Sequence, residues 1–456
     1  MTSRRRVLEA SVIGAALLAG CHGIGSDDFD ERSEPSDRTD ADSTGDGTTE
    51  PDSSVLDVKD FGAEMDGETD DTQAIRDAID AAEEGDTVQL PEGTALVSGD
   101  DKTYSGSNAI LIGGDAHPDD LTFRGEGTES VIKMDGGHEE NHMAFSVRIG
   151  DGIDGLLLEE FTIDGNAAEQ VQATGDGGWN LSLDGARDES VVPDITVRNV
   201  LSIDANQTAF RVTTGGCTLV RCTAENSALH GFGLDAWGEN RNAEEPITVR
   251  ESYSVNNELY GIDCSGGTIH VEDCVLEGNG QGTKTTEEVI ETAYRRCRFT
   301  GNDTLGYNRI TTPSKTGQRA VVTFDDVIAE DNGGRGFRLG VDTDYQIGTI
   351  IARRNNESNE TSTSISMNDN STVDANLVVS YNGRHGSGLR YGSERESTIG
   401  TYVHFGNPRG GINQVTDALE IENVFHQADA TSLEDIELDI DLPRNVPTAD
   451  EVGVSG

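Results

Sequence analysis

One phrase recurs along the chain between residues 191 and 414: an apolar stretch, an asparagine, about three further residues and then often a glycine. The asparagines that anchor it are Asn226, Asn256, Asn279, Asn302, Asn332, Asn355, Asn382 and Asn407. Successive anchors lie 23 to 30 residues apart. This period indicates a solenoid, because a repeat of that size cannot bury its own apolar face and has to stack on its neighbours.

The repeats have the composition of strands. They are rich in Val, Ile, Thr and Phe with short alternation, as in residues 194–203, and turn residues bound each run. Coils of about 23 residues with three short strands each predict an all-β fold, a parallel β-helix. In such a fold we expect one Asn per coil to stack on the next and to form hydrogen bonds along the axis.

The charge of the chain limits its partners. Its 456 residues carry 85 acidic against 33 basic side chains, a formal net charge of −52. This balance argues against nonspecific binding of nucleic acid or of an anionic membrane. It fits salt-rich surroundings, in which screening weakens the repulsion between carboxylates.

The first residues resemble an export leader. Arg4–Arg6 precede apolar residues, and the short apolar run from Ala10 ends in Leu-Ala-Gly before Cys21. The pattern resembles a twin-arginine signal followed by a lipobox, with Cys21 as the lipid-bearing residue. Together with the charge, it predicts an exported lipoprotein of the haloarchaeal type, held at the extracellular face of the cell membrane by its lipid.

The rest of the chain divides by composition. Residues 1–21 are the predicted leader, and residues 22–54 contain almost nothing apolar, which predicts a disordered acidic tether. We expect the β-helix with its N-terminal cap to span residues 55–416. Beyond residue 416 the repeat fades, so residues 417–456 are expected to form a terminal cover and an acidic tail.

The segment 55–98 resembles the first residues of the pectate-lyase-like superfamily. The motifs that carry the resemblance are Asp60-Phe61-Gly62-Ala63, Asp66-Gly67, Thr69-Asp70-Asp71-Thr72, Ala74-Ile75, Ala78-Ile79 and Leu90-Pro91-Glu92-Gly93-Thr94. The resemblance implies a right-handed parallel β-helix and a polysaccharide ligand, but not one reaction. The amphipathic helix within it is expected to cap the open end of the solenoid, with Asp70 and Asp71 as helix-capping residues.

Candidate site residues emerge when the coils are aligned on their asparagines. The column just before the glycine holds His230 and Tyr260, and strand alternation turns Asp263 outward on the same face. With Asp235 these residues form the predicted catalytic group. The same face is predicted to bind an acidic glycan through Arg309, Arg335, Arg338, Arg384, His385 and Arg390.

Tyr, His and Asp beside Arg are suited to removing a proton next to a carboxylate, as a lyase or an epimerase does. Residues 260–263 loosely resemble the Tyr-Gly-Phe-Asp of alginate epimerases, although Cys264-Ser265 follow where those enzymes have Pro-His. A glycosidase needs clustered carboxylates, and the departures from the polygalacturonase pattern make this reaction the less favoured alternative. A non-catalytic glycan-binding or envelope protein stays open as the alternative. Acidic residues are abundant enough for Ca²⁺ sites, but no calcium loop is visible.

Overall fold

The computed structural model describes residues 53–99, 101–103, 106–113, 118–137, 142–149, 153, 155–171, 177–185, 194–236, 245–286, 288–309, 319–355, 363–368, 370–383, 386–414, 416–426 and 446–454. All of these residues lie in one compact unit, residues 51–456. The predicted leader, Cys21 and residues 22–52 of the predicted tether lie outside the described residues. The domain boundaries given above therefore stay predictions.

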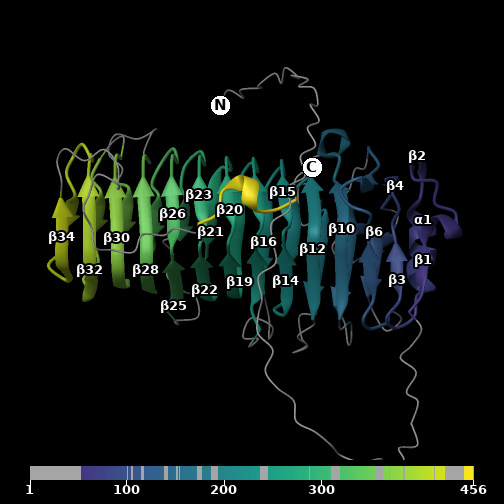
Figure 1. The fold of residues 1–456 in the computed structure, drawn as a ribbon, viewed down its shortest axis with the longest axis horizontal. Coiled ribbons are helices and arrows are strands. Elements are labelled where there is room, and N and C mark those ends of the chain that lie inside the picture. The colour runs from purple at the N-terminus through teal and green to yellow at the C-terminus, as the bar shows by residue number, and fades with distance from the viewer. Residues whose placement is uncertain are drawn as a thin grey trace, which may run out of the picture. The chain divides into compact units, whose positions relative to one another are not determined.

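The described residues are mostly β, and their strands pair in three parallel ladders (Figure 1). Ladder 1 contains β1 (Val55–Asp57), β3 (Thr87–Gln89), β7 (Thr122–Arg124), β10 (Leu156–Asp164), β12 (Ile195–Ile203), β14 (Cys217–Val220), β17 (Ile247–Arg250), β19 (Tyr260–Glu272), β22 (Val289–Arg295), β25 (Ala320–Asp325), β28 (Thr343–Arg353), β30 (Thr372–Tyr381), β32 (Ser397–Phe405) and β34 (Leu419–His426). Ladder 2 contains β2 (Asp66–Asp70), β4 (Gly93–Val97), β8 (Ser130–Met134), β15 (Thr223–Glu225), β18 (Tyr253–Val255), β20 (Val275–Glu277), β23 (Arg298–Thr300) and β26 (Val327–Glu330), with the second halves of β10, β12, β28, β30, β32 and β34. Ladder 3 contains β6 (Gly106–Gly113), β9 (His142–Ile149), β11 (Leu181–Gly185), β13 (Thr208–Val212), β16 (His230–Asp235), the first half of β19, β21 (Gln281–Thr285), β24 (Tyr307–Arg309), β27 (Phe337–Leu339), β29 (Ile365–Met367), β31 (Leu389–Tyr391) and β33 (Ile412–Gln414). A short strand, β5 (Asp101–Thr103), pairs antiparallel with β6.

The chain visits the three ladders in turn, so each strand pairs with the equivalent strand of the next coil. In ladder 3, Phe232 of β16 is the register partner of Ile262, and Tyr307 of β24 is the partner of Phe337. All four side chains are fully buried, as the sequence alternation predicted. The long parallel ladders are consistent with the predicted β-helix.

The turn between ladders 2 and 3 contains the expected ladder of asparagines. The side-chain Nδ2 of Asn302 donates to Oδ1 of Asn332 at 2.8 Å, and Asn332 donates in the same way to Asn355 at 2.9 Å. Each Oδ1 also accepts the backbone N–H of the preceding ladder residue. The prediction of hydrogen bonds along the axis is confirmed for these coils.

Three of the anchors occupy a neighbouring position instead. Asn226, Asn256 and Asn382 have φ of 58°, 56° and 48°, in the left-handed region that Asn tolerates better than most residues. In the coil of Asn256 the ladder member is the next residue, Asn257, which donates to Asn279 at 2.8 Å. The repeat therefore has two adjacent positions that favour Asn for different reasons.

Only short helices interrupt the described strands. They are η1 (Val58–Phe61), α1 (Thr72–Asp80), η2 (Ala167–Glu169) and η5 (Ala449–Glu451). Ile75, Ala78 and Ile79 of α1 are buried in the main core cluster, and α1 lies beside the first strands (Figure 1). Asp70 accepts the N–H of Thr72 at the start of α1, as expected. Asp71 is the N-cap residue of α1, and its carbonyl accepts the N–H of Ile75, but its side chain forms no capping hydrogen bond. The carboxylate accepts the N–H groups of residues 64 and 65 instead.

The end of the described chain returns over ladder 2. Residues 446–454 contact strands far away in sequence: Nε of Arg298 donates to the carbonyl of Pro447 at 2.9 Å, and the N–H of Val454 donates to Oγ1 of Thr223 at 2.7 Å. Val446 packs in an apolar cluster with Ile328 and other outward side chains of β26, β28, β30 and β32. This segment, the C-terminal strap, thus covers part of ladder 2.

No helix among the described residues is long and apolar enough to cross a membrane.

Candidate functional site

The candidate site lies at the start of the ladder 3 strands, directly after the asparagine turn. His230 is the first residue of β16 and the register partner of Tyr260, the first residue of β19. Gly233 of β16 is the partner of Asp263. Because register partners in adjacent coils lie about 4.8 Å apart, the fold brings the three polar side chains into one cluster.

The side chains of this cluster touch one another. The rings of His230 and Tyr260 stack with centroids 5.0 Å apart and an interplanar angle of 8°. Nε2 of His230 lies 3.4 Å from Oδ2 of Asp263. The structure thus brings together three of the four residues predicted to be catalytic, although their role stays a prediction.

A fourth member, Lys284, was missed by the sequence analysis. It is the register partner of Asp263 on β21, with Nζ 3.1 Å from Oδ2 of Asp263 and 4.9 Å from the ring centroid of Tyr260. Its coil is one residue shorter before the strand: Asp263 follows Asn257 by six residues, whereas Lys284 follows Asn279 by five. An alignment of the two coils that pairs the strand residues Ile262 and Thr283 places Lys284 beside Asp263.

Asp263 is held at both carboxylate oxygens. Oγ of Ser265 donates to Oδ1 at 2.9 Å, while Lys284 and His230 face Oδ2. The residue is 8% exposed. A buried carboxylate with these donors is suited to positioning the lysine and the imidazole.

The protonation of the two rings follows from their burial. Desolvation lowers the pKa of His230 to about 4, against the opposing charge of Asp263, and Lys284 adds to the lowering. Desolvation raises the pKa of Tyr260, which Lys284 partly opposes. At neutral pH the imidazole of His230 and the phenol of Tyr260 are therefore both neutral.

A groove of about 210 Å³ opens beside this cluster. It is lined by Trp179, Gln207, Thr208, Arg211, Leu229, His230, Gly233, Leu234, Asp235, Asp263 and Ser265. Asp235, the fourth residue predicted to be catalytic, thus lines the same groove as His230 and Asp263. Two other lining residues contact each other: the guanidinium of Arg211 lies 4.1 Å from the ring centroid of Trp179. Nη1 of Arg211 also donates to Oδ1 of Asp184 at 2.7 Å.

Toward the C-terminal coils the same outward column becomes basic. From Asp263 the register partners are, in order, Lys284, Asn308, Arg338, Ser366 and Arg390. Burial lowers the pKa of Arg335, and the positive charges of Arg338 and Arg390 lower it further, so the three side chains lie close together. Among the described residues, none of these three arginines forms an ion pair. Arg335, Arg338 and Arg390, the arginine row, are thus unpaired cations in a strongly acidic chain.

The expectation for Arg309 is corrected. It is 2% exposed, and its register partner Thr285 is fully buried, so Arg309 does not lie on the outer face with the arginine row. Strand alternation explains the position, because Arg309 is two residues after the buried Tyr307. Arg384 and His385, also predicted to bind substrate, lie outside the described residues.

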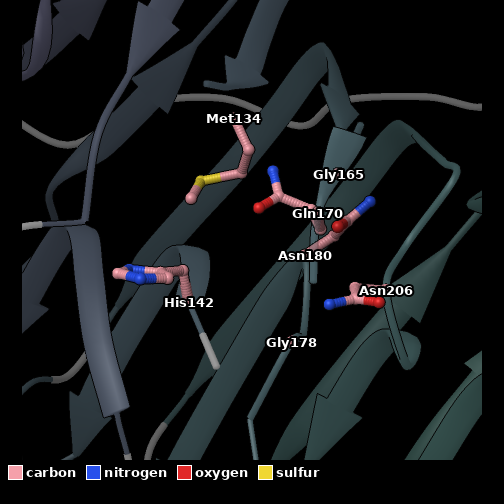
Figure 2. Close-up of a pocket in the computed structure, with 7 residues that line it drawn as sticks. All are labelled: Met134, His142, Gly165, Gln170, Gly178, Asn180 and Asn206. Carbon is pink, nitrogen blue, oxygen red and sulfur yellow. The ribbon is translucent and has the colours of Figure 1, made fainter. Parts of the chain in front are cut away.

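Two other hollows lie among the described residues, and neither suits an acidic glycan. The larger, of about 760 Å³, is lined by carboxylates that would repel a polyuronate: Asp374, Glu394, Glu396, Asp417 and Glu420. Within the described part of the chain, no three His, Cys, Asp or Glu side chains gather in a way that would hold a metal ion. The smaller hollow has a volume of about 10 Å³, with Met134 and His142 on one side and Gln170, Asn180 and Asn206 on the other (Figure 2). That volume suits a single water molecule and is too small for a sugar.

Comparison with known proteins points to polysaccharide-modifying β-helices. A profile of the family described as rhamnogalacturonase A/epimerase, pectate lyase-like matches residues 55–147. The A-module of the mannuronan C-5 epimerase AlgE6 of Azotobacter vinelandii superposes on 82% of this chain and 100% of its own, with a TM-score of 0.64 and 18% identity. At that identity the likeness shows a shared fold.

Two curated relatives from the same organism match in sequence. Mannuronan C5-epimerase AlgE3 is 30% identical over 232 residues, which is 49% of this chain and 12% of the relative. Alginate lyase 7 is 31% identical over 209 residues, which is 45% of this chain and 23% of the relative. The chain thus spans less than a quarter of the length of either relative, and it is similar to parts of both an epimerase and a lyase.

Proposed function

We propose that this protein is a polysaccharide lyase or epimerase that acts on an acidic glycan, a polymer of uronic acids. The observation that carries the proposal is the cluster of His230, Tyr260, Asp263 and Lys284 at one end of the arginine row. The similarity to AlgE3 and to alginate lyase 7 supports it, since their names give the same two reactions.

The chemistry begins with the proton on the sugar carbon next to the carboxylate. Lys284 neutralises that carboxylate and stabilises the negative charge that develops when the proton leaves. The carbon proton is taken up by Tyr260, once its phenol has given up its own proton, or by the neutral imidazole of His230, and Asp263 positions His230 and Lys284. The Nδ1 of His230 is buried and has no hydrogen-bond partner among the described residues, which favours Tyr260 for contact with the sugar.

The two reactions differ in the second step. In the lyase reaction the electron pair of the broken C–H bond forms a C=C bond, the glycosidic C–O bond breaks, and the leaving oxygen takes a proton from an acid such as Tyr260. In the epimerase reaction a second acid protonates the same carbon from its other face, so that one proton is taken up by the base and another is delivered. Both reactions use the same first step, so the described residues support both.

The arginine row would hold the neighbouring sugars. Arg338 lies two register steps from Lys284 and Arg390 two steps further, which is about 10 Å for each interval. A polyuronate laid along the coils therefore meets a cation at regular intervals. Changing Arg338 and Arg390 to Gln is expected to weaken polyuronate binding by about tenfold per arginine at low salt.

The test is incubation of the purified protein in high salt with a panel of polyuronates. A lyase gives the ultraviolet absorbance of an unsaturated uronate, and an epimerase gives solvent deuterium at the reacting carbon without chain cleavage. New reducing ends without either signal would indicate the glycosidase alternative. Binding without any product would support the alternative of a non-catalytic glycan-binding or envelope protein, for which the unpaired arginines are sufficient.

We also propose that the protein works at the extracellular face of the membrane, exported through the twin-arginine route and anchored by a lipid on Cys21. The leader pattern and the acidic composition support this proposal. Changing Cys21 to Ala is expected to move the protein from the membrane fraction to the medium. Retention of that variant on the membrane would contradict the anchor.

Two finer points of the fold are part of the same proposal. We propose that the coils wind right-handed and that α1 caps their first turn, which the buried face of Ile75, Ala78 and Ile79 supports. Changing Ile75 to Glu is expected to expose the first coils to proteolysis. The exposed variant Gln73→Glu is its control on the same helix.

A further inference from the structure

Arg309 presents a problem that the proposed function does not solve. It is among the largest fully buried side chains, and a guanidinium stays charged at any pH that a folded protein tolerates. Taking such a charge out of water is costly unless a counter-charge and hydrogen bonds compensate it. Among the described residues, no carboxylate pairs with Arg309 to supply such a counter-charge.

The hydrogen bonds of Arg309 are also incomplete. One terminal nitrogen, Nη1, donates to the carbonyl of Thr286 at 2.8 Å. Its Nε is buried and has no partner. Buried donors without an acceptor are rare in native proteins and point to a water molecule or an ion that completes them.

A second orphan donor lies in the same interior. The hydroxyl of Tyr307, two residues before Arg309, is buried and has no hydrogen-bond partner among the described residues within normal hydrogen-bond distance. The hydroxyl of Tyr345 accepts the N–H of Gly340 at 2.8 Å, which leaves its own proton to donate. Burial raises the pKa of Tyr345 to about 12 and that of Tyr307 well above its usual value, so neither phenol supplies a negative charge.

The three groups are electrostatic neighbours. The positive charge of Arg309 opposes the rise in pKa of both Tyr307 and Tyr345. The rings around them belong to the core, since Tyr307 lies 5.6 Å from Tyr294 and 4.9 Å from Phe324 between centroids. Among the described residues, the interior of these coils thus contains one cation and two phenol hydroxyls, and no anion.

We propose that Arg309, Tyr307 and Tyr345 form an internal anion site that holds a chloride-sized inorganic anion inside the coils. The anion neutralises the guanidinium and accepts from Nε and from the phenols. It is a structural ion: it stabilises the coils that join the catalytic cluster to the arginine row, and it does not depend on the glycan activity.

The direct test is a crystal structure of the full protein soaked in bromide, which replaces chloride and scatters anomalously. We expect an anomalous peak in contact with Nε of Arg309. A site filled by water alone, with no anomalous signal, would overturn the proposal.

The second test uses stability and needs no crystal. At constant ionic strength, replacing chloride by gluconate, which is too large for the site, is expected to lower the unfolding temperature of the wild type by about a few degrees. The Arg309→Met variant should fold, because a buried charge is often replaced by an apolar side chain of similar volume without loss, and should no longer respond to chloride. Arg250→Met, which removes an exposed arginine of β17, is the matched control and should respond like the wild type. An equal response of wild type and Arg309→Met would also overturn the proposal.

Discussion

The imidazole of His230 lies flat against the phenol of Tyr260, with centroids 5.0 Å apart, while its Nε2 faces Asp263 at 3.4 Å. Two consecutive coils therefore position one another's reactive groups. The stack fixes the orientation of Tyr260, and the contact with Asp263 fixes that of His230.

The first prediction concerns Tyr260. Changing it to Phe keeps the ring stack and removes the hydroxyl, so polyuronate binding should persist while turnover falls by about 10²–10⁴-fold. Turnover and binding are measured on the same preparation. The matched control is Tyr253→Phe on ladder 2, which loses a hydrogen bond to Glu277 but lies on another ladder and should keep full turnover.

Equal losses in the two tyrosine variants would mean that the effect is one of stability. Full turnover in Tyr260→Phe would exclude this hydroxyl from the reaction, and the proton transfer would then belong to His230.

A second prediction follows from the low pKa of His230. Its usual value is 6.5 and the folded value is about 4, so the unfolded chain binds more protons than the folded one between these pH values. Stability is therefore complete above pH 6.5 and decreases as the pH falls toward 4, by a contribution on the order of 3 kcal/mol. Denaturant unfolding at a series of pH values measures this slope, and the His230→Gln variant should show a smaller one.

Lys284 provides an independent check on the same group. Its charge lowers the pKa of His230, so the Lys284→Met variant should raise that pKa toward its usual value. Titration of the imidazole by NMR measures the change. A pKa that does not move would separate Lys284 from the cluster.

The sequence predicted the fold through one physical regularity. In the coils between residues 191 and 414 an Asn recurs at the second turn, either in the left-handed backbone, as at Asn226 and Asn256, or in the ladder, as at Asn302 and Asn332. Both positions favour Asn and are adjacent in the sequence. The repeat period of the asparagines is therefore visible before the two positions are distinguished. Strand alternation then identified the buried column correctly.

The same regularity limited the prediction of the site. Counting from Asn assumes coils of equal length, and it missed Lys284, whose coil is one residue shorter before the strand. It also placed Arg309 outside, although alternation turns that residue inward. Arginine side chains are usually exposed, and only the register with the buried Thr285 of the neighbouring coil shows that Arg309 points inward.

A third prediction concerns the asparagine ladder. Changing Asn302 to Ala removes the acceptor for the backbone and side-chain N–H groups of Asn279, and it leaves the carbonyl of Leu276 and Oδ1 of Asn332 without this donor. Each buried unsatisfied group costs about 1–3 kcal/mol, so the free energy of unfolding should fall by roughly 2–4 kcal/mol. Asn226→Gly, which retains the left-handed backbone at an exposed turn, should be nearly neutral. A neutral Asn302→Ala would mean that water replaces the ladder.

The fourth prediction concerns the C-terminal strap. In a solenoid each coil contacts only its neighbours, so the two ends can unfold separately. The strap changes this, because Val446 packs beside Ile328 while Val454 bonds to Thr223, which lies several coils away. Removal of residues 446–456 should therefore lower the unfolding temperature and split a single transition into two, as measured by calorimetry. Glu451→Ala, which removes hydrogen bonds to Thr448 within the strap and leaves both of its ends docked, should keep one transition. A truncated chain that still unfolds in one transition at the wild-type temperature would show that the ladders alone make the coils cooperative.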